Sequence, residues 1–155
     1  METIVSFPSL LFVLTFVLVC YVLGATFVEG LVNYRSWRHI GPQDFKTYHQ
    51  AIGPRVIAIV VVPFVVSVAL TVLLLWFRPS PIPLWSVWLS LGADLLAIIV
   101  SVVFQIPSQF EFDRNGLSLP RLERLIKLEW IRNAAHSFNA VLFVWMMLRL
   151  TDSVQ

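Results

Sequence analysis

The stretch VIAIVVVPFVVSVALTVLLLWF, residues 56–77, carries no charged side chain. It is long enough to cross the hydrocarbon core of a bilayer as a helix, which takes about 20 residues. Other apolar stretches precede and follow it, and the last can be completed by Arg132 and Arg149, whose long side chains reach opposite interfaces. The predicted spans are residues 4–28, 56–77, 84–106 and 131–150.

These spans fill most of a chain of 155 residues, of which 58% are hydrophobic and 13% charged. The connecting segments are too short to bury a soluble core. The sequence therefore predicts an all-α polytopic membrane protein. We expect residues 1–155 to form a single four-transmembrane-helix bundle, with a short interfacial helix in each cytoplasmic loop.

Several classes of function are excluded or disfavoured. The single cysteine, Cys20, lies inside the first predicted span, which excludes an internal disulfide and a cysteine-based metal cluster. The first apolar stretch lacks a preceding basic segment and is too long for a signal-peptide core, so we expect it to be retained. No Gly-rich phosphate loop, serine-nucleophile motif or zinc-ligand spacing is present, which argues against nucleotide or soluble hydrolase chemistry.

The distribution of basic residues predicts the orientation. Nine of the eleven Lys and Arg lie after the first and third predicted spans, and only Arg78 and Arg149 lie on the other side. By the positive-inside rule, loops 29–55 and 107–130 are cytoplasmic and both termini are outside a bacterial plasma (inner) membrane. The expected partners are the lipid bilayer and other membrane subunits or further copies of this chain. Nucleic acid is not expected, because no basic run is interleaved with stacking aromatics.

Local signals divide the first loop. Gly41-Pro42 is expected to end an extension of the first helix, and Asp44 to cap a short helix carrying His49. Gly53-Pro54 is expected to restart the chain into the second span. Within that span, Pro63 frees a backbone carbonyl and favours a kink.

The second loop allows two patterns. Phe110 and Phe112 before Asn115-Gly116, with alternating apolar residues after it, are typical of a two-residue β-hairpin. From Pro120 onward the apolar spacing becomes helical, which predicts an interfacial helix leading into the fourth span. Its expected role is to anchor the loop among the lipid headgroups.

Polar residues inside the spans carry the functional information, because each is costly in hydrocarbon unless it is paired or faces a cavity. One group shares the cytoplasmic ends of three spans, at spacings of one or two helical turns. The predicted ligand pocket consists of Glu29, Asn33, Gln105, Gln109, Arg132, His136 and Asn139.

Within this pocket, Glu29 and Arg132 can form a charge pair. His136 then remains as a titratable imidazole, suited to act as general base, proton relay, or metal or haem ligand. His136 and Glu29 are accordingly the catalytic candidates. Alternatively, the polar residues only hydrogen-bond one another and water at the interface, with His136 satisfied by a carbonyl. No metal site is predicted, and the only candidate metal ligands are His136 and His49, which can bend over the cavity mouth.

Asp94 stands apart, about ten residues into the third span and nearer the outside. An acid at this depth is a possible proton-coupling group. The alternative is a neutral carboxyl group that hydrogen-bonds Ser67, Thr71 or a backbone carbonyl.

The segments Phe45-Lys-Thr-Tyr48-His49, Gln105-Ile106-Pro107 and Glu129-Trp130-Ile131-Arg132 resemble a group of small bacterial four-helix membrane proteins similar to the anthrone-oxygenase-like family. The resemblance implies a four-helix fold and an oxygenase-like or redox role. In the group's pattern a histidine follows Tyr-His by three residues and another ends Gln-x-Pro-x. This chain has Ile52 and Gln109 at those positions, so a metal or catalytic set built on those histidines would be incomplete.

Three functions stay open at this stage. The chain can bind an apolar ligand or cofactor, such as a quinone, polyketide or haem, in a redox or oxygenase-like role. It can be an accessory or assembly subunit of a larger membrane complex, with its polar face used for helix packing. Finally, it can be a small proton-coupled transporter that uses Asp94 or Glu29.

Overall fold

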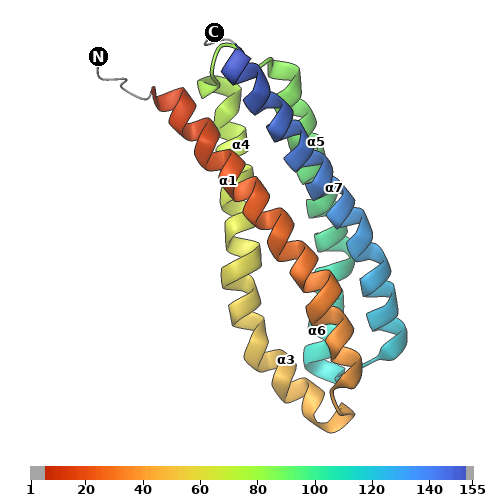
Figure 1. Cartoon of the computed structure of the whole chain (residues 1–155). Coiled ribbons are helices and arrows are strands. Elements are labelled where there is room, and N and C mark those ends of the chain that lie inside the picture. Colours follow the sequence, from red (N-terminus) through yellow and green to blue (C-terminus); the bar gives the residue numbers. More distant parts are fainter. Residues whose placement is uncertain (1–5, 153–155) are drawn as a thin grey trace.

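The computed structural model describes residues 6–152, and every regular element within that range is helical. Three continuous helices are long and apolar enough to cross a membrane: Phe7–His39, Pro42–Phe77 and Leu84–Asn115. A further long helix, α7 (Leu119–Asp152), completes the fold. The all-helical prediction is therefore confirmed for the described part of the chain (Figure 1).

The first long helix consists of α1 (Phe7–Val28), a π-helical turn η1 (Glu29–Asn33), α2 (Tyr34–Ser36) and a 3-10 turn η2 (Trp37–His39). It begins where the Ser6 hydroxyl accepts a hydrogen bond from the Ser9 N–H. It ends just before Gly41-Pro42, as predicted.

The second long helix differs from the prediction. It comprises α3 (Pro42–Val56), the π-helical η3 (Ile57–Val61) and α4 (Val62–Phe77) without interruption. The predicted restart at Gly53-Pro54 is wrong, as is the predicted cap, because Gly41 is the N-cap and Asp44 lies in the first turn. Buried Phe45 and His49 hold α3 against neighbouring helices. This tertiary packing outweighs the local preference to break at proline.

Pro63 leaves a carbonyl without its helical donor, as predicted, and another helix supplies the missing bond. Proline has no N–H, so the carbonyl four residues earlier, that of Ile59, loses its partner. The Tyr21 hydroxyl of α1 donates a hydrogen bond to this oxygen at 2.9 Å. The bond ties the first long helix to η3 inside the apolar region, where an unpaired carbonyl would be costly.

The third long helix consists of α5 (Leu84–Val100), the π-helical η4 (Ser101–Gln105) and α6 (Ile106–Asn115). The predicted hairpin at Asn115-Gly116 is wrong. Gly116 has φ 77°, and its N–H donates to the Phe112 carbonyl at 3.0 Å. This glycine therefore closes a helix C-terminus, a position that favours the same left-handed conformation as a hairpin turn.

The predicted interfacial helix and fourth span are one continuous helix, α7. Its first turns bury their apolar side against Tyr34 and Trp37, through Leu122, Leu125 and Ile126. This face is covered by protein, so the expected role in anchoring the loop among headgroups is wrong for these side chains.

The long helices pack in a closed ring: α1 contacts α4 and α7, and α5 contacts α4 and α7. The beginning of α1 and the end of α7 lie at the same end of the bundle as the turn that joins α4 to α5 (Figure 1). One apolar cluster, which includes Phe12, Leu74 and Phe143, fills this end. A second, the aromatic cluster around Trp37, fills the other. The polar residues lie mainly between the two.

Gly30 permits the close approach of η1 and α7, which predicts a sharp cost for a single methyl group. A Cβ at this position would lie 2.6 Å from Cγ of Glu129. The Glu129 carboxylate is held by Gln105 and Arg132, so the side chain is not free to move away. We expect Gly30→Ala to lower the free energy of unfolding by about 1–3 kcal/mol.

Unfolding of the detergent-solubilised protein measures this effect. Gly24→Ala and Gly92→Ala are matched controls, because a Cβ at either position meets nothing within 4 Å. Both controls should be neutral or slightly stabilising. Equal losses in all three variants would contradict the close approach.

Candidate functional site

A cavity of about 540 Å³ lies between the second and third long helices. Most of its wall is apolar, formed by η3 and α4 on one side and by α5, η4 and α6 on the other. Five of the seven predicted pocket residues line it: Glu29, Gln105, Gln109, Arg132 and His136. The cavity therefore has long apolar walls and a polar end.

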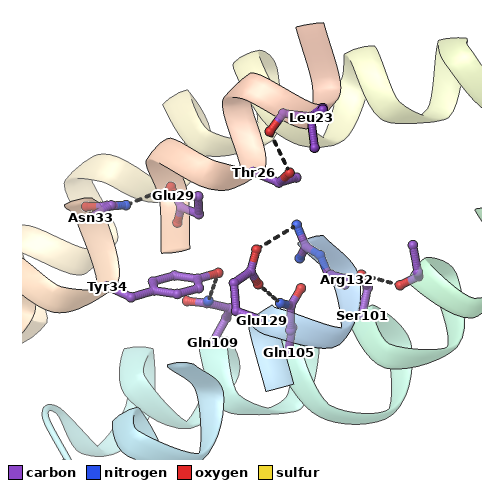
Figure 2. A network of polar contacts seen from close by, with 11 residues as sticks. Leu23, Thr26, Glu29, Asn33, Tyr34, Ser101, Gln105, Gln109, Glu129 and Arg132 are labelled. Carbon is purple, nitrogen blue, oxygen red and sulfur yellow. Dashed lines mark hydrogen bonds and ion pairs between the residues drawn. The ribbon is translucent and has the colours of Figure 1, made fainter. Parts of the chain in front are cut away.

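Glu129 organises the polar end, and the sequence did not point to it. Its side chain is only 2% exposed and accepts a hydrogen bond from Nε2 of Gln105. One of its oxygens lies 3.6 Å from an Arg132 nitrogen (Figure 2). Arg132 thus pairs with an acid one turn away on α7, and the expected Glu29–Arg132 ion pair is not formed. Nε of Arg132 is buried without a hydrogen bond to any residue between 6 and 152.

Glu29 faces this pair from η1 and is held by its own helix. Its carboxylate accepts a hydrogen bond from Nδ2 of Asn33 at 2.9 Å (Figure 2). Oδ1 of Asn33 in turn accepts from Nε1 of Trp37 at 3.1 Å and from the Tyr48 hydroxyl at 3.4 Å. Asn33 therefore holds the Glu29 side chain in position from outside the cavity and does not line the cavity itself.

His136 is a buried polar group that lines the cavity. It is 4% exposed, and its ring meets Phe64 edge to face at 5.1 Å between centroids. Neither imidazole nitrogen has a hydrogen-bond partner within the described part of the chain, so the alternative in which a carbonyl satisfies His136 is wrong. The imidazole is available to a ligand.

Asn139 and Asp94 form a separate cluster outside the cavity. Nδ2 of Asn139 donates to Oδ1 of Asp94 at 2.9 Å, and the Ser90 hydroxyl donates to Oδ1 of Asn139 at 2.6 Å. The partner expected for Asp94 on the second helix is wrong, because the Thr71 hydroxyl donates to the Ser67 carbonyl instead. Asn139 thus belongs with Asp94 and not with the pocket.

His49 is buried at the end of the cavity where α3 faces α6. Its Nδ1 lies 2.7 Å from Oδ1 of Asp113, and its Nε2 lies 2.7 Å from Oε1 of Gln109. Nε2 of Gln109 donates to the Tyr34 hydroxyl at 3.4 Å. Both ring nitrogens are therefore engaged, which makes His49 a link between α3 and α6. No group of three His, Cys, Asp or Glu residues suited to hold a metal ion occurs in the range 6–152.

Sequence reasoning missed Glu129, Asp113 and Tyr34. Glu129 is not among the predicted pocket residues, although it lies three residues before Arg132 and so one turn away on the same face. Asp113 lies one turn after Gln109, which was a usable signal of a shared face. Tyr34 carried no such signal, because its position depends on how η1 rotates the helix beyond it.

Comparisons of this chain with family models, curated proteins and solved structures gave no match. The class of molecule defined by the fold is a helical protein with three helices long and apolar enough to span a membrane.

Proposed function

We propose that this protein is a small four-span integral membrane protein that binds an apolar ligand with a hydrogen-bonding head in the cavity between its second and third helices. The observation that carries the proposal is the environment of His136. Its ring lines a cavity of about 540 Å³, in the usual range for small-molecule sites, and none of the described residues hydrogen-bonds to it.

The proposal takes α7 as the fourth membrane span. Between Arg132 and Arg149 this helix has no charged residue, and it packs along both α1 and α5. With four spans, loops 29–55 and 107–130 share one side, on which nine of the eleven basic residues lie. We propose that this side is the cytoplasm of a bacterial cell.

The charges around the polar end favour an uncharged ligand head. Two carboxylates, Glu29 and Glu129, surround one guanidinium, that of Arg132. A phosphate or carboxylate headgroup would therefore have to compete with Glu129 for the guanidinium of Arg132. A head with both acceptor and donor oxygens can accept from Arg132 or His136 and donate to Glu29.

A quinone or related ring ketone supplies the acceptor oxygens, and the corresponding quinol or phenol also supplies the donor. Haem would find an imidazole ligand in His136, but its propionates would compete with Glu129 for the single guanidinium of Arg132. The resemblance to the anthrone-oxygenase-like group is compatible with the same ligand class, because an anthrone is a polycyclic aromatic ketone. In an oxygenase-like or redox role, His136 would serve as the proton acceptor nearest the ligand.

Purification in mild detergent, followed by an absorption spectrum and mass analysis of bound molecules, tests the proposal. A quinone-type spectrum with an equimolar lipid-soluble ring compound is expected. A stoichiometric second protein without any small molecule would instead favour an accessory subunit of a larger complex. A haem spectrum would overturn the assigned ligand class.

The topology predicts a labelling pattern in intact cells. With Cys20 replaced by Ala, Ser118→Cys should be protected from an impermeant thiol reagent and Ser153→Cys should react, because the two positions lie on opposite sides of the membrane. Ser153 lies outside the described residues, and Ser118 lies just before α7. Both sites should label equally after permeabilisation. The reverse pattern in intact cells would invert the orientation.

A further inference from the structure

We infer that the cavity is entered sideways from the bilayer, through the gap between η3 and η4, and that its ligand carries a long apolar tail that lies in this gap. The inference rests on the proposed function and adds the route of access and the class of ligand. It commits to one occupant, a membrane-dissolved ring compound with a tail.

The first support is the exposure of the cavity wall itself. Ile57 and Val61 of η3 line the cavity and are 55% and 44% exposed, and Val102 of η4 lines it and is 56% exposed. These three side chains lie between the cavity and the surface, so the wall is only one side chain thick there. These residues lie within the apolar helices that can cross a membrane, so the opening faces lipid tails.

The end of the cavity nearest the charged loops is closed by polar links between α3 and α6. His49 binds Asp113 and Gln109, Nε2 of Gln50 donates to the Asp113 carbonyl at 3.4 Å, and Nζ of Lys46 donates to the Arg114 carbonyl at 3.3 Å. The aromatic cluster around Trp37, with fully buried Phe45 and Phe112, lies behind these links. This end of the cavity therefore offers no route of entry to a water-soluble ligand.

The opposite end is closed by apolar packing. There α4 packs against α5, and Leu74 and Val87 are fully buried in the cluster that includes Phe143. The two long helices are thus held together at both ends of the cavity. The middle, where η3 and η4 face the cavity, is the remaining opening.

The backbone provides a physical reason for the gap. The two π-helical segments that border the gap are each followed within two residues by a proline, Pro63 after η3 and Pro107 after η4. A π turn widens the helix and a proline removes a helical hydrogen bond, so the regular side-chain ridges that pack two helices together are interrupted. Both interruptions occur at the level of the cavity.

The distribution of polarity then orients the ligand. The polar end, with Glu29, Arg132 and His136, belongs to the first long helix and α7, whereas the gap is bordered by valine and isoleucine. A hydrogen-bonding ring would therefore lie inward and an apolar tail outward, in contact with lipid. A ring compound without a tail would leave the apolar walls of the gap incompletely filled.

Blocking the gap with bulk tests the inference. We would reconstitute wild type, Val61→Trp and Val102→Trp in lipid nanodiscs and measure binding of a tritiated naphthoquinone with a long isoprenoid tail, subtracting empty discs. Val62→Trp and Val103→Trp are matched controls, because these neighbours are 51% and 54% exposed and do not line the cavity. We expect the gap variants to slow association by roughly tenfold and the controls to behave as wild type.

The same naphthoquinone without its tail separates the possible failures. It should bind wild type more weakly than the tailed compound. Unchanged binding of the tailed compound in both gap variants would overturn the lateral route while leaving the pocket intact. If wild type binds neither compound, but His136 is still required for binding some other co-purified molecule, the tailed-quinone class is wrong. Binding of neither compound, with no co-purified molecule, overturns the proposed function itself.

Discussion

Replacing His136 by Leu should weaken binding of the tailed naphthoquinone by about ten- to a hundredfold, because a buried polar atom of the ligand would lose its partner at about 1–3 kcal/mol. His136 makes no hydrogen bond to another described residue and packs through its ring on Phe64. The folded yield should therefore change little. Equilibrium binding in nanodiscs, with size-exclusion profiles for folding, measures both quantities.

Two further variants sharpen this test. His136→Gln keeps a hydrogen-bonding group of similar size but cannot titrate near neutral pH, so it should retain part of the binding and lose any step that needs a proton acceptor. His39→Gln is the matched control, because His39 is exposed and lies outside the cavity. If His136→Leu lowered stability and left binding unchanged, His136 would be a packing residue.

Arg132→Met should destabilise the protein by about 3–5 kcal/mol, the usual effect of removing one partner from a buried ion pair. Glu129 is 2% exposed and Glu29 is 7% exposed, so both carboxylates would remain buried without the guanidinium. The measurement is thermal or denaturant unfolding in detergent. Lys127→Met, on an exposed position of the same helix, should have little effect.

A second substitution checks the cause. Adding Glu129→Gln to Arg132→Met removes one stranded carboxylate and keeps an amide that can face Gln105. The double variant should recover much of the lost stability. Additive losses would mean that Arg132 contributes mainly through packing of its long stem.

The apolar stretches and the polar faces could be predicted because they depend on composition and helical spacing alone. Residues Glu29 and Gln105 come from distant parts of the chain, yet both line one cavity. The same reasoning gave a wrong prediction for Asn139, which does not line the cavity. A spacing of three from His136 allows a range of directions, and its side chain turned toward Asp94, a partner that the sequence placed nearer the outside.

The errors at Gly53-Pro54 and Asn115-Gly116 have a common cause. Each dipeptide has a local conformational preference that is compatible with two different structures. Gly116 serves a helix terminus as well as it would serve a hairpin. Pro54 is tolerated because the buried side chains of Phe45 and His49 hold α3 in place. Only contacts between distant segments decide between such alternatives, and a single sequence does not record them.

The π-helical segments set a limit on how this chain can change in length. Each holds one residue more than a regular turn needs, so it acts as a phase shift between the two halves of its helix. Deleting a single residue from η4, such as Val103, would leave hydrophobicity nearly untouched and still leave a helix long enough to span a bilayer. It would also rotate everything beyond by about 100° and turn Gln109 and Asp113 away from His49. Such a deletion would leave the hydropathy profile nearly unchanged, yet it should break the polar links that close one end of the cavity. A conservative substitution at the same position should leave these links intact.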